Sequence, residues 1–163
     1  MSLDPIFTLH PSLTITSTSV GLGFLTSTPL PPSCTLLTIP QTAVLTHAHA
    51  RAHLPSLPTP VSDQLALQIY MALHRNDETS PHHAYLSSLA ASTDNSTNPL
   101  TWPLPLLALL AGTNVHAAVL RQKTTLRECV ETACVEGLTV EGLTWAAGCY
   151  MSRAFPGRLG VDG

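Results

Sequence analysis

Hydrophobic and polar positions alternate over short stretches of the first forty residues. Apolar residues and threonine alternate at 13–16, and the high content of β-branched side chains favours a strand there. A turn is expected at 21–23, a second apolar stretch at 24–25, and a proline-rich break at 29–33. A last strand at 35–39 ends at proline. The pattern predicts a small β meander.

The pattern weakens between residues 43 and 60. Pro55, Pro58 and Pro60 each fix φ and restrain the residue before them, so this stretch is expected to be a stiff, extended connection. We place the main boundary here, between a β-rich part at 1–58 and a helical part at 59–155.

After this connection the apolar period changes to that of a helix. Leu65, Ile69 and Leu73 recur every four residues behind Ser62, which predicts a capped amphipathic helix. The same signals predict helices at 62–75, 82–90, 104–111, 115–136 and 139–155, with Gly112, Gly137 and Thr139 as boundary residues. Residues 104–111 are apolar on most faces, so burial is expected. The predicted fold class is α+β.

Composition narrows the possible functions. The chain has 163 residues, 44% of them hydrophobic and 10% charged, with a formal net charge of -3. Only seven lysines and arginines are present, too few for a nucleic-acid footprint. The longest apolar run, at 104–111, is far shorter than the roughly 20 residues that span a bilayer. No secretory signal opens the chain, so a cytoplasmic or nuclear location and free, buried cysteines are expected.

Several polar motifs could carry chemistry. His49 and His53 would share one face if their segment were helical, a spacing compatible with a transition metal. No metalloprotease glutamate follows, so surface histidines in a loop are favoured and no metal site is assigned. The adjacent His82 and His83 are expected to form a solvated helix cap. No Gly-x-Ser-x-Gly elbow occurs, and the strand expected after Gly23 excludes a dinucleotide-binding turn.

Five segments carry a resemblance to a known family. They comprise the glycine turn, proline excursion and Leu-Leu-Thr-Ile-Pro strand end at 20–40, Ala-Tyr-Leu at 84–86, Pro-Leu-Thr-Trp at 99–102, Leu-Ala-Gly-Thr at 110–113, and the tryptophan helix ending in Ser-Arg-Ala-Phe at 145–155. In this order they resemble SET-domain protein-lysine methyltransferases of the Rubisco large-subunit methyltransferase type, which includes fungal ribosomal-protein lysine methyltransferases.

The resemblance implies an S-adenosyl-L-methionine-dependent methyltransferase whose SET domain is split by a helical insert. Residues 1–58 would be the N-terminal SET part, 59–155 the insert, and 156–163 the start of the C-terminal SET part. Cofactor-binding positions carried over from the family are Gly21, Leu22, Gly23 and Arg153. A guanidinium suits the carboxylate of the cofactor. The implied partner is a protein substrate such as a ribosomal protein, with no membrane and no nucleic acid.

The sequence departs from the family pattern at several positions, and two hypotheses about the function of the chain follow. Val20 stands where many members have an acidic residue, and Ser33 where they usually have a glycine. The asparagine-histidine segment and the channel tyrosine of the family do not occur before Gly163, so no catalytic residue is assigned. We expect either a methyltransferase truncated before its catalytic segment or an inactive SET-derived interaction module with exposed strand edges. Cofactor binding would discriminate between them.

Overall fold

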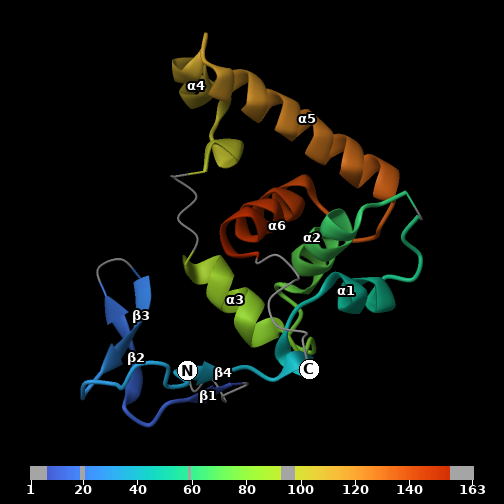
Figure 1. Ribbon diagram of the computed structural model, residues 1–163. Coiled ribbons are helices and arrows are strands. Elements are labelled where there is room, and N and C mark those ends of the chain that lie inside the picture. Colours follow the sequence, from blue (N-terminus) through green and yellow to red (C-terminus); the bar gives the residue numbers. More distant parts are fainter. Residues whose placement is uncertain (1–6, 19–20, 59, 93–97, 155–163) are drawn as a thin grey trace. The chain divides into compact units, whose positions relative to one another are not determined.

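The structure is a computed structural model that describes residues 7–18, 21–58, 60–92 and 98–154 (Figure 1). The side chains of residues 18, 21, 22, 90–92 and 153 are outside this description. Short strands precede a run of helices, which confirms the α+β class. Contacts divide the chain into two compact units, Met1–Leu45 and Thr46–Gly163, and each is described by itself.

The first unit contains two separate two-stranded antiparallel sheets. Strand β1 (Thr8–Leu9) pairs with β4 (Leu37–Thr38), and β2 (Leu13–Thr18) pairs with β3 (Gly21–Thr26). A short 3-10 helix, η1 (Gln41–Ala43), follows. The expected single meander is therefore wrong. Prolines supply no ladder N–H, and Ser33 has a left-handed φ of 63°, so the chain turns and β4 returns to β1 instead of adding to β3.

The glycines at 21 and 23 lie in a strand, not in the predicted turn. Gly21 pairs with Thr18 and Gly23 pairs with Thr16, and residues 19–20 lie outside the described residues. Glycine can adopt almost any φ, so these two glycines fit a strand as readily as a turn. Their pairing with β2 holds them in the extended conformation. The strand predicted at 13–16 is confirmed as β2.

The hairpin of β2 and β3 has two different faces. Because side chains alternate, the register places Ile15 opposite Phe24 on one face. The other face carries Gly21, Gly23 and Leu25 opposite threonines. Ile15, Phe24 and Leu25 are exposed, so apolar side chains reach solvent on both faces.

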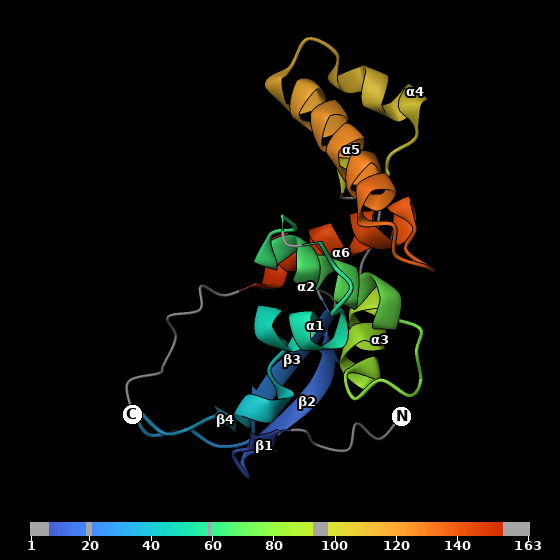
Figure 2. The ribbon, with the colours of Figure 1, turned by 90° about the vertical axis from the view of Figure 1, so that its right-hand side faces the viewer.

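The second unit is helical. Its helices are α1 (His47–His53), α2 (Asp63–His74), α3 (His83–Ser92), α4 (Leu104–Leu107), α5 (Asn114–Ala133) and α6 (Val140–Arg153), with the 3-10 turns η3 (Pro99–Thr101) and η4 (Ala108–Leu110). Figures 1 and 2 show α2 between α1 and α6. The core lies among α2, α5, α6 and the segment before α2, and includes Ile69, Leu126, Leu138 and Leu143.

Local signals set most helix boundaries as expected. The Ser62 hydroxyl accepts the Leu65 N–H at 3.2 Å, and the Thr139 hydroxyl accepts the Gly142 N–H at 3.0 Å. Gly112 has a φ of 82°, a left-handed conformation that stops η4 as predicted. The end of α5 differs, because Cys134 itself adopts the left-handed φ of 47° as the C-cap.

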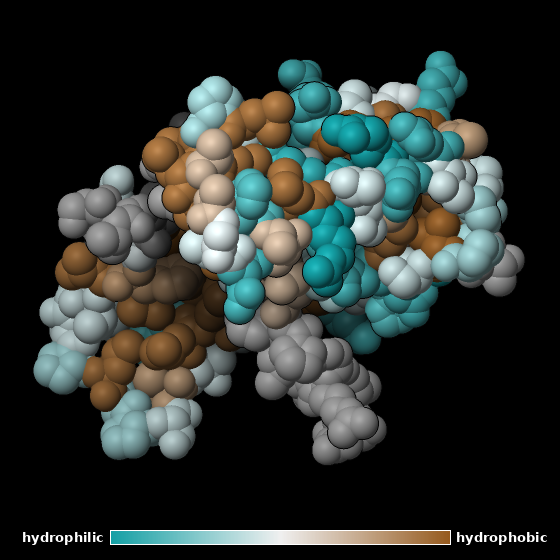
Figure 3. Space-filling model, turned by 90° about the horizontal axis from the view of Figure 1, so that it is seen from above, coloured by the Kyte–Doolittle hydropathy of each residue, from teal (hydrophilic) through white to brown (hydrophobic). Residues whose placement is uncertain are grey.

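Burial departs from expectation in α4 and η4. Leu107 is buried, but Leu104 is 73% exposed and Leu109 is 77% exposed, so the predicted burial of residues 104–111 is wrong. The four-residue helix turns only one side toward its neighbours, and no other described element covers the rest. Apolar side chains therefore lie among polar ones on this side of the molecule (Figure 3).

Two smaller expectations also change. The helix predicted at 139–155 ends at Arg153, and Met151 in its last turn is exposed. Of the free cysteines, Cys149 is buried whereas Cys134 is exposed, so the expected burial holds for only part of them. Across the described residues, every helix is too short or too polar to traverse a bilayer.

Candidate functional site

The structure brings together three of the sequence-predicted cofactor residues. Gly21, Leu22 and Gly23 are the first residues of β3, and the two glycines lie on the same face of the hairpin. Neither has a Cβ, so this half of the strand presents its backbone to an approaching molecule. The side chain of Leu22 lies outside the described residues.

Arg153 occupies a different element. It is the last residue of α6, directly before the C-cap Ala154, whose N–H is bonded to the Tyr150 carbonyl at 2.8 Å. Its side chain lies outside the described residues. The glycine strand belongs to the first unit and Arg153 to the second.

The histidine segment at 47–53 is a helix, and the predicted loop is wrong. The Thr46 hydroxyl caps α1 by accepting the His49 N–H at 3.1 Å. Between the histidines of this segment stand three alanines and Arg51, all of high helix propensity. His49 and His53 share a face of this helix, as expected if the segment were helical. Their rings stack with centroids 4.1 Å apart.

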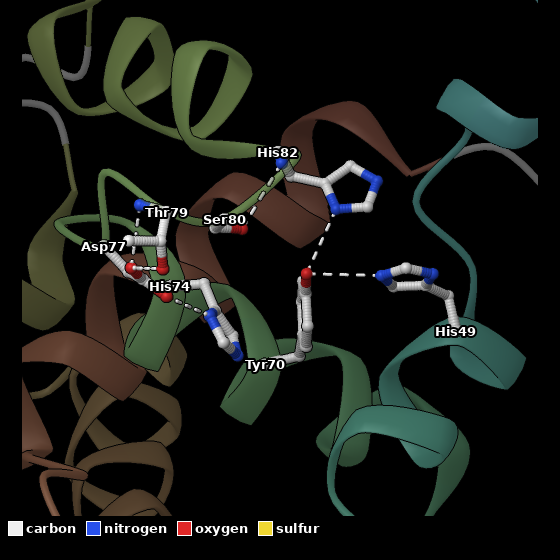
Figure 4. A network of polar contacts seen from close by, with 7 residues as sticks. All are labelled: His49, Tyr70, His74, Asp77, Thr79, Ser80 and His82. Carbon is white, nitrogen blue, oxygen red and sulfur yellow. Dashed lines mark hydrogen bonds and ion pairs between the residues drawn. The ribbon is translucent and has the colours of Figure 1, made fainter.

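This face of α1 belongs to a cluster of four imidazoles around one phenol, which we call the imidazole cluster. Its members are His49, His53, Tyr70, His74 and His82. The Tyr70 side chain is fully buried. Its hydroxyl lies 3.2 Å from His49 Nε2 and 3.1 Å from His82 Nδ1, as Figure 4 shows.

His82 is buried, so the expectation of a solvated cap is wrong. Its backbone N–H donates to the Ser80 hydroxyl at 3.3 Å, which turns the segment before α3 inward. Its ring meets the His49 ring edge-on, with centroids 4.6 Å apart. Adjacent histidines on a helix do point apart, but His82 precedes α3 and its direction is set by this turn.

Burial and mutual repulsion favour the neutral imidazoles. Burial lowers the pKa of His49 below 6.5, and the neighbouring His53 and His74 add to the effect. Burial likewise lowers the pKa of His82, followed by the charges of His49, His53 and His74. Both central histidines are therefore held as neutral hydrogen-bonding groups near pH 7.

The far end of the cluster is anchored by a carboxylate. His74 Nδ1 lies 3.0 Å from an oxygen of Asp77, whose other oxygen accepts the Thr79 hydroxyl at 2.6 Å and the Thr79 N–H at 3.0 Å. These hydrogen bonds, the Thr79 hydroxyl first and His74 next, lower the pKa of Asp77 to about 2. Asp77 is therefore a carboxylate at any pH near neutrality.

The cluster is a hydrogen-bonding centre. Among the described residues, no group of three or more histidine, cysteine, aspartate or glutamate side chains is placed to hold a metal ion. Tyr70, His74 and His82 were not predicted as members from the sequence. The available signal was the i, i+4 pair on α1 together with a tyrosine on the apolar face of the next helix.

Comparison with solved structures identifies the fold. The crystal structure of the SET domain of LSMT bound to MeLysine and AdoHcy is 18% identical, covers 91% of this chain and superposes with a TM-score of 0.77. The structure of Rubisco LSMT bound to AdoMet is also 18% identical, covers 88% of this chain and gives a TM-score of 0.73. At this identity the likeness shows the fold alone, that of part of a SET domain.

The match spans only part of these neighbours. This chain covers 37% of the first neighbour's length and 36% of the second's. No protein-family model and no curated protein matches the chain.

Proposed function

We propose that this chain is the N-terminal portion of an S-adenosyl-L-methionine-dependent protein-lysine N-methyltransferase. The observation that carries the proposal is the fold, which matches over 91% of the chain a SET domain bound to MeLysine and AdoHcy. The five motif segments of the sequence support it independently. In this proposal residues 1–58 are the N-terminal SET part, 59–155 the helical insert, and 156–163 the start of the C-terminal part.

The residues fit part of a cofactor site. At the start of β3, Gly21 and Gly23 place no side chain on their face of the strand, so backbone groups there can contact the cofactor at close range. Arg153 would pair with the cofactor carboxylate through a bidentate guanidinium contact. When bound, the cofactor supplies an electrophilic methyl group for transfer to an amine.

No described residue is assigned the role of aligning the amine with that methyl group. In-line transfer needs a deprotonated nucleophile and a channel that excludes water. Tyr70 is committed to two imidazoles, and the other tyrosines with described side chains, Tyr85 and Tyr150, lie in α3 and α6. The proposed protein substrate, a ribosomal protein, and the proposed cytoplasmic or nuclear location rest on the family resemblance.

Cofactor binding by the 163-residue chain tests the proposal. Isothermal titration should show saturable binding of S-adenosyl-L-methionine, and Arg153→Ala should weaken it about 10- to 100-fold, because a charged hydrogen-bonded pair is lost. Arg121→Ala on the exposed surface of α5 is the matched control and should bind as the unmodified chain does. Absence of saturable binding by a chain with native circular dichroism would contradict a cofactor site in this chain.

A second function, that of a SET-derived interaction module, is favoured by one observation. Ile15 and Phe24 face each other across the hairpin, and both are exposed. An exposed apolar cross-strand pair suits docking of another chain. A partner that binds the chain but not Phe24→Asp, and still binds Thr14→Asp on the opposite face, would support this function, particularly if the cofactor does not bind.

A further inference from the structure

The Tyr70 hydroxyl is the meeting point of three segments of the helical unit. His49 approaches it from α1, Tyr70 itself extends from α2, and His82 approaches from the turn before α3, as Figure 4 shows. The phenol is fully buried, so water cannot replace either imidazole without an opening of the structure. Through these two contacts the hydroxyl connects α1 to α2 and to the turn before α3.

The number of protons on the two imidazoles decides whether both can form a hydrogen bond with the Tyr70 hydroxyl. A tyrosine hydroxyl donates one hydrogen bond, so one facing imidazole nitrogen must accept it while the other donates an N–H to the phenol oxygen. One added proton can be placed without breaking either contact. With both imidazoles protonated, both facing nitrogens carry hydrogen, and the buried hydroxyl proton has neither His49 nor His82 as acceptor. The second proton therefore breaks this connection.

The neighbouring side chains also oppose protonation of His49 and His82. His53 stacks on His49 at 4.1 Å and His82 meets it at 4.6 Å, so protonation brings cations together. The nearby carboxylates have other partners, since Asp63 is bonded to Arg51 and Asp77 to His74. The remaining titratable residues with described side chains on α1, α2 and the packed helices α3 and α6 are His47, His83, Tyr85, Glu141, Cys149 and Tyr150.

We propose that His49, Tyr70 and His82 form a proton-sensitive latch that holds α1 against α2 when both imidazoles are neutral and releases α1 when both are protonated. The inference is independent of cofactor binding and adds a regulated element to the helical unit. Protonation adds charge to the buried His82 ring and the half-buried His49 ring and leaves the buried Tyr70 hydroxyl proton without either acceptor, and release of α1 relieves both effects.

Helix α1 is the segment that yields first. Ala50 is its only described residue that is buried. Apart from the latch, Arg51 ties α1 to the start of α2 through Asp63 at 3.2 Å and through the Val61 carbonyl. That ion pair is largely exposed and contributes little. Helix α6, in contrast, is buried along most of its length.

The direction of the pH effect follows from the neutral state. The pKa values of His49 and His82 are lowered in the folded chain, so below the ordinary value of 6.5 the open state binds more protons than the closed state. The latch is therefore complete above pH 6.5 and is lost as the pH falls through the lowered values. The pKa of Asp77, at about 2, belongs to a lower and separate pH range.

Amide hydrogen exchange of the full chain, corrected for intrinsic exchange rates, tests the latch at pH 7 and pH 5. The informative amides are Ala50, bonded to the Thr46 carbonyl, and Leu54, bonded to the Ala50 carbonyl. Their protection should fall at least about tenfold at pH 5, the factor that corresponds to one pKa unit. Amides of α6 serve as the internal reference and should keep their protection.

Two variants separate the latch from general acid sensitivity. His82→Gln keeps a hydrogen-bonding group near the hydroxyl but cannot take up a proton, so α1 should show the same protection at both pH values. His116→Gln, near the start of α5, makes the same change away from the cluster and should retain the full pH effect. Equal pH effects on α1 and α6 in the unmodified chain would overturn the proposal, as would a full effect in His82→Gln.

Discussion

The two units of the chain differ in how much of themselves they bury. Between residues 7 and 45, no residue with described burial is buried, and Phe24, Leu36 and Ile39 are exposed. The helical unit buries Ile69, Leu143 and their neighbours in a shared core. Two-stranded sheets alone are marginal in water, whereas helices that share a core sustain one another.

This difference shows how unequally the chain distributes its stability. The helical unit carries its own apolar core, while the β unit has hydrogen-bonded strands with apolar side chains on open faces. The solved structures of similar fold are more than twice as long as the part that this chain covers. We infer that the β unit needs an additional surface to be stable, whether a cofactor or another polypeptide segment.

The largest expected effect is a cavity in the helical core. Leu143→Ala removes a fully buried side chain among α2, α5 and α6, and should lower the free energy of unfolding by about 2–5 kcal/mol. Leu109→Ala, at a 77% exposed position in the same unit, should cost less than about 0.5 kcal/mol. Urea unfolding followed by the fluorescence of the two tryptophans, Trp102 and Trp145, measures both.

The β unit should respond differently to the same kind of change. Phe24→Ala removes an exposed aromatic ring and should leave the unfolding midpoint of the chain almost unchanged. A loss as large as that in Leu143→Ala would mean that Phe24 is covered in solution, and the contrast between the two units would then fail.

The second prediction concerns the imidazole cluster at constant pH. Tyr70→Phe keeps the ring that packs on His53 and His74 but removes the hydroxyl that His49 and His82 share. The loss should be about 1–3 kcal/mol at pH 7, because buried polar groups lose their partner. Tyr150→Phe in α6, where the tyrosine is only half-buried, should change stability far less. Equal losses would remove the special role of the buried hydroxyl.

Local structure is predicted well from the sequence where a single residue determines it, as at the start of a helix. Ser62 and Thr139 cap α2 and α6 as expected, because a hydroxyl three residues before a free N–H suffices. Burial was predicted poorly for residues 104–111. An apolar run shows that burial would be favourable, but whether a second element covers it depends on tertiary packing.

The candidate site shows the same limit. Helix α1 was missed because its histidines and alanines carry no apolar stripe, and the segment is only seven residues long. The i, i+4 geometry of His49 and His53 was foreseen as a condition, but their partner His82 comes from a turn 33 positions after His49 in the numbering. The glycines at 21 and 23 were located as a motif, but two glycines do not determine the register of the hairpin that contains them.

A third prediction uses the one lysine of the chain, Lys123. Its ammonium donates to the Trp102 carbonyl at 2.9 Å and so ties α5 to the residue after η3. Lys123→Met keeps the aliphatic stem and should cost about 1 kcal/mol in urea unfolding. Arg127→Met, an exposed change on the same helix, is the control and should be close to neutral. Equal costs would show that loss of a surface charge, and not this bond, is responsible.

The smallest expected effect comes from replacing a residue with a left-handed φ by glycine, once in each unit. Ser33 in the β unit and Cys134 in the helical unit both have left-handed φ values, 63° and 47°, which glycine adopts at lower cost. Cys134→Gly should raise the free energy of unfolding by about 0.5–1 kcal/mol, because Cys134 ends a helix that packs on the core.

Ser33→Gly relieves the same backbone strain at a position where the resemblance also favours glycine. The relief should appear as slower amide exchange in β4 but not as a higher urea midpoint, because global unfolding is set by the helical core. Gln122→Gly, at an exposed position inside α5 with an ordinary helical backbone, is the control and should destabilise by about 0.5–1 kcal/mol. If Ser33→Gly raised the urea midpoint as much as Cys134→Gly, the two units would unfold together, and the β unit would be stabilised by the helical one.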